Sequence, residues 1–344
     1  MRTSDFDYPL RRDLIAQTPL EPRDHSRLLV VDRSSGTLQH RYFYDLGHFL
    51  KSGDLLVLND SRVIPGRLKG HRLLTGGVIE ILLLDRVGTG LWKALVKPGK
   101  RLRPGAEFEV DGITGEILED NGGGTRLVYI SDESVIQRAG NMPLPPYIHT
   151  QLSDNERYQT VYAKDMGSSA APTAGLHFTR ELLDSLGREG IRFAHVTLHV
   201  GLDTFRKVES ENPLRHKIHS EFFAIGEEAA REINLAHSEG RRIISVGTTS
   251  VRVLEQAALL HEGGRHGASS GAVATVSGWA ELFILPGHRF RLVDGIITNF
   301  HLPRSTLMML VCSFAGRDNV MEAYRQAMLL GYRLYSFGDA MLLL

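Results

Sequence analysis

Cysteine is nearly absent from the sequence: the 344-residue chain has a single one, Cys312. One thiol cannot build an internal disulfide framework or a cluster of thiolate metal ligands. It lies in the apolar run 307–314, which favours a buried, unreactive thiol over a nucleophile. The cysteine count therefore excludes a disulfide-stabilised scaffold and a thiolate metal centre.

Long apolar runs and a net charge are missing as well. No run approaches the roughly 20 residues that a membrane helix needs, and the first fourteen residues carry charges where a signal peptide would be apolar. Forty Lys plus Arg balance forty Asp plus Glu, so the formal net charge is zero. The overall charge indicates no particular partner, and we expect a cytoplasmic protein that does not contact a membrane.

Two sequence textures are present instead. The length exceeds what one hydrophobic core usually organises, which favours two domains. Between residues 78 and 130, short runs such as VIEILLL, LWKALV and TRLVYI alternate with Gly, Pro and Asp, as in a small antiparallel barrel or sandwich. From about residue 176, helical periods alternate with β-branched runs, and the early runs SRLLVVD and DLLVLND match this second texture. We therefore predict an α/β fold, with a catalytic domain formed by 1–62 and 150–344 and an inserted β domain at 63–149.

Within the second texture, helix signals and strand signals alternate. Thr179 is placed to cap a helix that Gly190 ends, and further helices are expected at 227–240 and from about residues 250, 305 and 319. Strands are expected at 192–200, 241–246 and 293–300. The proline-rich stretch 142–148 favours a stiff linker back from the inserted domain.

The predicted insertion holds a local excess of positive charge. Between Arg62 and Arg103 the sequence has ten basic residues and two acidic ones, and part of the excess lies in the turn KPGKRLRPG. Such a patch suits a phosphate backbone, although a solvated face balanced by the acidic segment 107–133 explains it equally well. The candidate contacts to nucleic acid are Arg62, Arg67, Lys69, Lys97, Lys100, Arg101 and Arg103.

A strand, a small polar turn and a helix follow one another at 241–256. Gly247, Thr248, Thr249 and Ser250 stand at the carboxyl end of the strand, where free N–H groups favour an anion. Arg252, in the first turn of the helix, can add a guanidinium fork. Ordinary N-capping by Thr or Ser is the alternative, since the turn matches neither dinucleotide nor phosphate-loop motifs.

Polar groups also follow two other strands. Asn299, Phe300 and His301 end the strand at 293–300, and the ring of Phe300 offers a surface on which a base can stack. His199 shares a strand face with His195 and Thr197, and Thr204 and Phe205 come after it. His216 and His219 invite a zinc interpretation, but without a cysteine cluster or an H-E-x-x-H motif we predict no metal.

The segment SSAAPTAGLHFT, residues 168–179, packs small residues around a proline and a histidine. Small side chains at this position, Gly175 among them, allow a ligand to approach the backbone closely, and Thr173 and His177 offer polar contacts. A tight loop that needs small residues for packing between domains is the alternative.

Several motifs together resemble one family. They include DFDYPL, LIAQTPLEPRDHSRLLV, DLLVLNDSRVIPGRL, AAPTAGLHFT, SVGTTSVRVLE, TNFHLPRSTLMMLV and YRLYSFGDAMLL, in order from Asp5 to Leu342. They resemble the S-adenosylmethionine:tRNA ribosyltransferase-isomerase family of queuosine biosynthesis. The resemblance implies a larger α/β barrel-like domain with a β-barrel insert, and a reaction that moves the ribosyl part of S-adenosylmethionine onto aminomethyl-deazaguanine at the tRNA wobble position. The products would be epoxyqueuosine in tRNA, adenine and methionine.

The implied reaction assigns roles to the candidate residues. It needs a proton-abstracting base and an acid for the departing adenine, and His177, His199, His219 and His301 all lie in motifs that resemble the family's. His177 and His199 are the first choices, because one precedes a helix and the other ends a strand. The predicted S-adenosylmethionine-binding residues are Thr173, Gly175, Thr204, Phe205, Gly247, Thr248, Thr249, Ser250, Arg252, Asn299 and Phe300. S-adenosylmethionine would be consumed as a substrate, with no cofactor besides it, and the basic residues of the insertion would bind tRNA. The oligomeric state stays open, with a monomer favoured.

Three positions depart from the family pattern, and two other functions compete with the one implied. Asp203 replaces a glycine in GLDTF, Arg206–Lys207 replaces a pair ending in proline, and Arg11 stands where proline is common. A methyltransferase would need a glycine-rich first turn, which SRLLVVDRSSGT matches poorly. A non-catalytic RNA-binding module would bind RNA in a salt-dependent way without taking S-adenosylmethionine.

Overall fold

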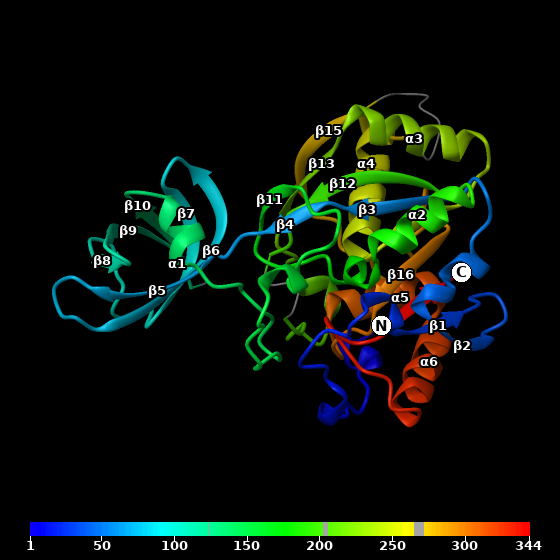
Figure 1. Ribbon diagram of the computed structural model, residues 1–344, viewed down its shortest axis with the longest axis horizontal. Coiled ribbons are helices and arrows are strands. Elements are labelled where there is room, and N and C mark those ends of the chain that lie inside the picture. Colours follow the sequence, from blue (N-terminus) through cyan, green and yellow to red (C-terminus); the bar gives the residue numbers. More distant parts are fainter. Residues whose placement is uncertain (123, 202–205, 265–271) are drawn as a thin grey trace. The chain divides into compact units, whose positions relative to one another are not determined.

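The chain divides into two compact units, each with its own core (Figure 1). The structure is a computed structural model that describes residues 1–122, 124–201, 206–264 and 272–344. Unit 1 comprises Met1–Ser61, Pro146–Lys164 and Pro172–Leu344, and unit 2 comprises Arg62–Pro145 and Asp165–Ala171. In the described ranges no helix has the length and apolar character to cross a membrane. The predicted fold class, α/β with an antiparallel barrel, is confirmed.

Unit 1 contains a nine-stranded mixed sheet. Its strands lie in the order β15 (Val276–Ala280), β13 (Glu221–Ile225), β12 (Arg192–Leu198), β3 (Leu55–Asn59), β14 (Ile243–Val246), β16 (Gly295–Asn299), β17 (Ala340–Leu343), β1 (Arg27–Val31) and β2 (Leu38–Tyr42). Strands β12, β3, β14 and β16 run parallel to one another, whereas β17 is antiparallel to β16 and parallel to β1. The carboxyl ends of those four parallel strands and the amino ends of β17 and β1 therefore share one edge, called the carboxyl edge below.

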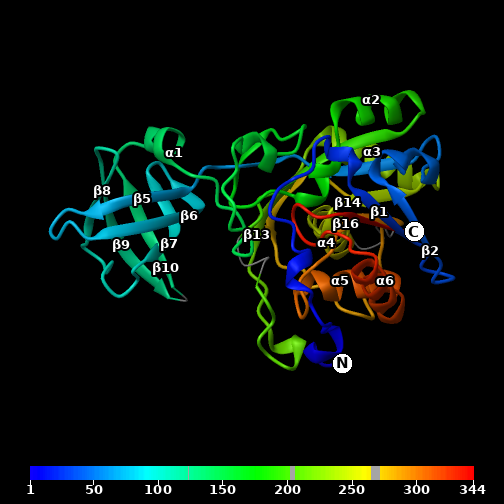
Figure 2. The ribbon, with the colours of Figure 1, turned by 60° about the horizontal axis from the view of Figure 1, so that its bottom comes forward.

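Helices lie on both sides of this sheet. Figure 2 shows α2 on one side and α5 and α6 on the other. Thr179 caps α2 by accepting from the Leu182 N–H, as predicted, and Ser305, near the expected start of its helix, caps α5 by accepting from the Met308 N–H. The α-helices of this unit are α2 (Arg180–Arg188), α3 (Glu227–Ser238), α4 (Thr248–Gly264), α5 (Thr306–Ala315) and α6 (Arg317–Leu329). Short 3-10 helices are η1 (Thr3–Phe6), η2 (Arg12–Leu14), η3 (Arg23–His25), η4 (Phe43–Phe49), η5 (Asn155–Tyr158), η6 (Thr173–His177) and η8 (Pro213–Arg215).

Alternate residues of the central strands form one core. Leu56, Val246 and Ile297 pack in the same cluster as Phe178 of the segment after η6 and Leu186 of α2. All four residues of β14 and all five of β3 and β16 are buried, as expected for parallel strands covered on both faces. Burial of apolar surface stabilises the fold by roughly 25 cal/mol per Å². The buried strands therefore hold the polar turns at their ends in fixed positions.

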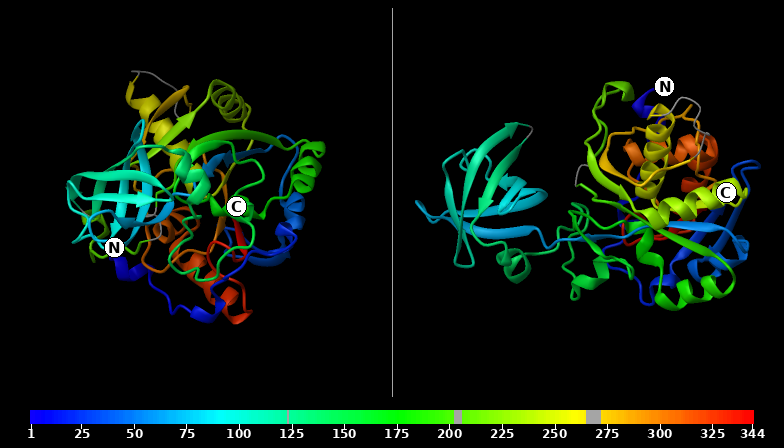
Figure 3. Two further views of the ribbon diagram at one scale, coloured as in Figure 1. Left: turned by 60° about the vertical axis from the view of Figure 1, so that its left-hand side comes forward. Right: turned by 90° about the horizontal axis from the view of Figure 1, so that it is seen from above.

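Unit 2 is built on a closed antiparallel barrel (Figures 1 and 3). Its strands, in the closed order β10-β7-β6-β5-β8-β9, are β5 (Arg67–Arg72), β6 (Val78–Gly88), β7 (Leu91–Lys97), β8 (Glu107–Val110), β9 (Ile113–Gly122) and β10 (Thr125–Ile130), followed by α1 (Ser134–Ala139). Leu68, Ala94, Phe108 and Ile117 belong to its core. A separate two-stranded sheet pairs β4 (Ser61–Val63) with β11 (Asp165–Ser168).

Opposite charges occupy different parts of the barrel. Exposed lysines lie on the two strands that flank β6, Lys69 on β5 and Lys93 and Lys97 on β7, and these three residues are called the basic face. The neighbouring strands β8 and β9 carry the acidic face, comprising Glu107, Glu109, Glu119 and Asp120, which are likewise exposed. The closed strand order thus turns a charge difference along the sequence into a charge difference across one small barrel.

Candidate functional site

The carboxyl edge of the unit 1 sheet gathers the polar turns that the sequence singled out. Asp60 follows β3, Gly247 follows β14, and Asn299 ends β16. The helix η6 contacts β16 and brings the segment around His177 to the same edge. Ligands of open α/β sheets bind at this kind of edge.

A chain of hydrogen bonds joins four of these side chains. The Thr173 hydroxyl donates to Asn299 Oδ1 (2.9 Å), Asn299 Nδ2 lies 3.1 Å from His177 Nε2, and His177 Nδ1 lies 2.7 Å from Ser26 Oγ. Asn299 Nδ2 also donates to the Tyr335 carbonyl oxygen, which can only accept (3.2 Å). The Asn299 amide is therefore oriented, so His177 accepts at Nε2 and donates its Nδ1 proton to Ser26.

His177 is held in its neutral form. It is buried and its ring stacks on Phe43, with ring centroids 5.0 Å apart. Burial, together with the positive charges of Arg333 and Arg23, lowers the pKa of His177 to about 3. At neutral pH the ring therefore acts as a fixed hydrogen-bonding group, with both nitrogens used by Asn299 and Ser26.

His301 and Phe300 lie deeper in the unit. The Nε2 atom of His301 is 2.7 Å from Thr298 Oγ1, and burial lowers the pKa of His301 to about 3. Phe300 is 1% exposed, and its ring packs edge-on against Tyr324 and Tyr332 at centroid distances of 5.1 and 5.9 Å. This packing favours a core role for Phe300 over an open stacking surface for a base.

His199, at the carboxyl edge, is more open than His177 and His301. It follows β12, is half-buried, and its Nδ1 lies 2.9 Å from the hydroxyl of buried Ser61. Its ring stacks on Phe222 at 5.6 Å, which leaves it oriented by two neighbours. His219 is exposed and precedes β13, whose amino end lies at the carboxyl edge because β13 is antiparallel to β12.

The turn after β14 lies against the segment that carries His177. Gly247 has φ +90°, a conformation that favours glycine, and a Cβ added there would lie 3.6 Å from the Cβ of Ala174. The Ser250 hydroxyl donates to the Val246 carbonyl oxygen (2.9 Å). In the described part of the chain, the buried hydroxyl of Thr249 has no hydrogen-bond partner. The turn therefore offers an unsatisfied polar group beside Ala174.

Arg252 is already paired inside the protein. Its Nη1 donates to Glu221 Oε2, and its other nitrogens donate to the carbonyl oxygens of Ala280 (3.0 Å) and Leu282 (3.3 Å). Glu221 also accepts from the Gly201 N–H (2.7 Å), so this buried ion pair holds the start of the segment after β12. The guanidinium of Arg252 is thus neutralised by Glu221, a partner that the sequence did not suggest.

Residue 175 has to be a glycine, because the side chain of Tyr162 leaves no room for a Cβ atom there. A Cβ at this position would lie 2.1 Å from the Tyr162 hydroxyl oxygen and 2.8 Å from Thr160 Cγ2. The hydroxyls of Tyr162 and Thr160 are both buried and have no hydrogen-bond partner within the described residues. Burial raises the pKa of Tyr162 well above its usual value, so this hydroxyl stays protonated.

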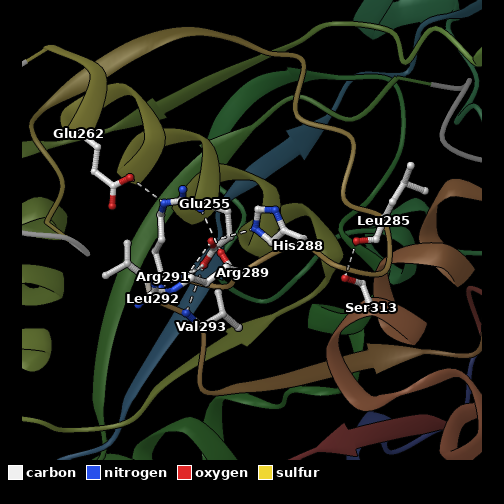
Figure 4. Close-up of polar contacts among 9 residues, drawn as sticks. All are labelled: Glu255, Glu262, Leu285, His288, Arg289, Arg291, Leu292, Val293 and Ser313. Carbon is white, nitrogen blue, oxygen red and sulfur yellow. Dashed lines mark hydrogen bonds and ion pairs between the residues drawn. The ribbon is translucent and has the colours of Figure 1, made fainter. Parts of the chain in front are cut away.

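The approach to β16 is held by one buried carboxylate (Figure 4). Glu255 of α4 is fully buried and accepts from the backbone N–H groups of Arg291, Leu292 and Val293 at 3.0–3.3 Å. It also lies 3.1 Å from His288 Nε2. One helix therefore begins at the turn after β14 and, two turns later, fixes the segment that leads into β16 and Asn299.

The remaining predicted residues fall into two groups. The basic candidates all belong to unit 2: Arg62 and Arg67 are half-buried, whereas Lys69, Lys97, Lys100, Arg101 and Arg103 are exposed. Thr204 and Phe205 lie outside the described residues, as does Asp203. Among the residues that the structure does describe, no group of three or more His, Cys, Asp or Glu side chains is placed to hold a metal ion.

These features define an α/β protein with a polar site at the edge of its sheet and a separate antiparallel barrel. The chain belongs to the queuosine biosynthesis protein family, whose model matches residues 3–343. It is 53% identical to the S-adenosylmethionine:tRNA ribosyltransferase-isomerase of Symbiobacterium thermophilum and 51% identical to that of Dehalococcoides mccartyi, over 100% of both chains in each case. The crystal structure of S-adenosylmethionine tRNA ribosyltransferase from Thermotoga maritima is similar with a TM-score of 0.57 and 40% identity, covering 99% of this chain and 100% of that one. The resemblance noted in the sequence is confirmed.

Proposed function

We propose that this protein transfers and isomerises the ribosyl part of S-adenosylmethionine onto 7-aminomethyl-7-deazaguanine at the wobble position of tRNA. The products are epoxyqueuosine in tRNA, adenine and methionine. The observation that carries the proposal is full-length identity near 50% to relatives that bear this enzyme name. The polar carboxyl edge of unit 1 supports it, because it supplies neutral and titratable groups where a nucleoside would bind.

The reaction begins with loss of a proton made acidic by the neighbouring sulfonium. Of the four candidate histidines, the geometry favours His199 for this step, because it is half-buried and oriented by Ser61. His177 and His301 are neutral and buried, and His177 uses both ring nitrogens within the protein. Their role is to hold Asn299, Thr298 and the strand ends in place. His219 stays a candidate for the acid that assists adenine departure.

S-adenosylmethionine binds along the segment from Thr173 to Gly175 and the turn from Gly247 to Ser250. Ala174 lies against Gly247, and the unsatisfied hydroxyl of Thr249 faces the same turn. Asn299, fixed by Thr173 and Tyr335, closes this side of the site. Thr204 and Phe205 complete the proposed set, and Arg252 contributes by fixing Glu221 and Gly201.

The deciding experiment combines purified protein, S-adenosylmethionine and a tRNA that carries aminomethyl-deazaguanine. The tRNA is digested and its nucleosides are identified by mass spectrometry, while free adenine is measured. Epoxyqueuosine with an equal amount of adenine is the expected result. A methylated nucleoside would instead identify a methyltransferase, and bound but unchanged tRNA would identify an RNA-binding module.

A further inference from the structure

A small pocket beside His177 is lined by two arginines that the proposed chemistry leaves without a role. Its volume is about 20 Å³, and its polar lining comprises Arg23, Ser26, Arg157, His177 and Ser336, all of unit 1. Since one water needs roughly 10–15 Å³, the pocket has room for a small polar group and not for a nucleoside. Its size therefore restricts the ligand to one functional group of a larger molecule.

Both guanidinium groups donate to backbone carbonyl oxygens, and Arg157 is also paired with a carboxylate. Arg23 donates to the carbonyl oxygens of Gln159 (2.6 Å) and Glu156 (3.0 Å), and Arg157 donates to the carbonyl oxygen of Leu20. The ion pair of Arg157 is with Glu21 (3.0 Å), whose side chain is 76% exposed and thus well solvated. None of the residues described as lining the pocket is acidic.

Charges of both signs surround the pocket. Burial lowers the pKa of Arg23 and the charge of Arg157 acts in the same direction, whereas the carboxylates of Glu21, Asp154 and Glu156 raise it. The positive charge of Arg333 acts on His177, and the Arg333 Nη1 is buried without a hydrogen-bond partner among the described residues. Like charges held together in a partly buried place repel one another, and a bound anion would offset that repulsion.

Ser26 adds a hydrogen-bond donor of fixed direction. Because His177 donates its Nδ1 proton to Ser26 Oγ, the hydroxyl hydrogen of Ser26 is left to donate to a group in the pocket. Two guanidinium groups and a hydroxyl are the donors that a carboxylate needs. Arg252, the cation that the sequence suggested for this purpose, is already neutralised by Glu221.

We propose that this pocket binds the α-carboxylate at the amino-acid end of S-adenosylmethionine, with Arg23 and Arg157 as the binding residues. The inference rests on the proposed function, which supplies the ligand. A phosphate of the tRNA shares the same chemistry, so the test separates the two sources. Ser26 would link the carboxylate to His177 and Asn299 at the carboxyl edge.

The test measures equilibrium binding of S-adenosylmethionine, and of its analogue without the carboxylate, to the whole protein in the absence of tRNA. The wild-type protein should prefer S-adenosylmethionine by about 10- to 100-fold. Arg157→Gln and Arg23→Gln should lose most of that preference while binding the analogue within about threefold of wild type. The preference of Arg157→Lys for S-adenosylmethionine over the analogue should lie between that of the wild type and that of Arg157→Gln, because lysine keeps the charge and loses the guanidinium fork. Arg11→Gln, in an exposed pair with Asp13, is the matched control.

Two outcomes would overturn the inference. One is an Arg157→Gln protein, folded as judged by its thermal unfolding midpoint, that keeps the wild-type preference for S-adenosylmethionine over the analogue. The other is a variant whose tRNA affinity falls while its S-adenosylmethionine affinity does not, which would assign the pocket to a phosphate. If wild-type protein bound S-adenosylmethionine through its carboxylate but released no adenine with tRNA, the proposed function would fail and the pocket would stand.

Discussion

His199 is the residue on which the proposed chemistry depends most directly. Replacing it by Gln removes a group able to take a proton while keeping a hydrogen bond to Ser61, so kcat should fall by about 10²- to 10⁴-fold with a small change in the KM for S-adenosylmethionine. Adenine release is the measurement. His237→Gln, an exposed residue near the end of α3, is the control. A His199→Gln enzyme of near wild-type kcat would move the base elsewhere.

The two buried histidines link stability to pH. In the unfolded chain a histidine takes up a proton below its usual pKa of about 6.5, whereas folded His177 and His301 stay neutral down to about pH 3. Acidification from pH 7 to 5 therefore favours unfolding, by about 1.4 kcal/mol per pH unit for each histidine below pH 6.5. Denaturant unfolding at several pH values measures this slope.

A variant isolates the contribution of one of these histidines. His301→Gln should reduce the pH slope of the unfolding free energy by about 1.4 kcal/mol per unit, whatever its effect on stability at pH 7. His237→Gln, a change at an exposed position of α3, is the matched control and should keep the wild-type slope. Equal slopes for the wild type and His301→Gln would mean that His301 is protonated in the folded state.

Gly175 and Tyr162 should behave as a coupled pair. Gly175→Ala places a methyl group 2.1 Å from the Tyr162 hydroxyl oxygen, so we expect a loss of about 1–3 kcal/mol in unfolding free energy. Tyr162→Phe alone should be nearly neutral, because that hydroxyl lacks a partner in the described structure. The double variant should recover about 1 kcal/mol relative to the sum of the single changes. Strict additivity would contradict the contact.

Among the elements, α4 carries one buried carboxylate, Glu255, whose hydrogen bonds should contribute measurably to stability. Glu255→Gln removes the charge that three backbone N–H groups share and turns one oxygen into a donor, so unfolding free energy should fall by about 3 kcal/mol. Glu262→Gln, on the same helix and 2.9 Å from Arg291 Nε, should cost less than about 1 kcal/mol because its pair is partly exposed. Similar losses for both would argue against the Glu255 cluster.

Elements with local signals could be predicted from the sequence, and elements defined by distant pairing could not. Capping residues marked α2 and α5, and apolar runs marked β3 and β16. Strand β5 was missed because Arg, Lys and Gly dominate RLKGHR, although its alternate residues are buried in the barrel. Asp165–Ala171 joins unit 2 because β11 pairs with β4, a contact about a hundred residues away along the chain. The predicted domain boundaries stay a prediction, which limited proteolysis can test.

The same limit applies to the candidate site. Strand ends identified Gly247, Asn299 and His199, because parallel strands bring their carboxyl ends to one edge. The side chains that contact the site residues lie in other parts of the sequence: Ser26 precedes β1, and Glu221 begins β13. Although Ser26 lies within the motif LIAQTPLEPRDHSRLLV, the residues next to it and to Glu221 do not indicate which distant side chains they contact. The identity of the paired groups, such as Arg252 with Glu221, depends on packing that residue order alone does not specify.

At the scale of the whole molecule, the barrel should set the salt dependence of tRNA binding. Lys97→Gln, Lys100→Gln and Arg101→Gln should each weaken binding and reduce the slope of log affinity against log salt by about 1, if each contacts one phosphate. Glu119→Gln, on the acidic face of the same barrel, is the matched control and should leave the slope unchanged. Unchanged slopes for the three basic variants would place tRNA elsewhere.

The division of the barrel into a basic and an acidic face has a kinetic consequence. Residues 62–145 carry twelve basic and ten acidic side chains, so their charges nearly cancel. Because exposed lysines lie on β5 and β7 and exposed carboxylates on β8 and β9, the barrel has an electric dipole, and the field of a polyanion exerts a torque on it before any contact forms. The barrel would arrive with β5, β6 and β7 toward the RNA, which raises the fraction of productive encounters without requiring a net positive protein.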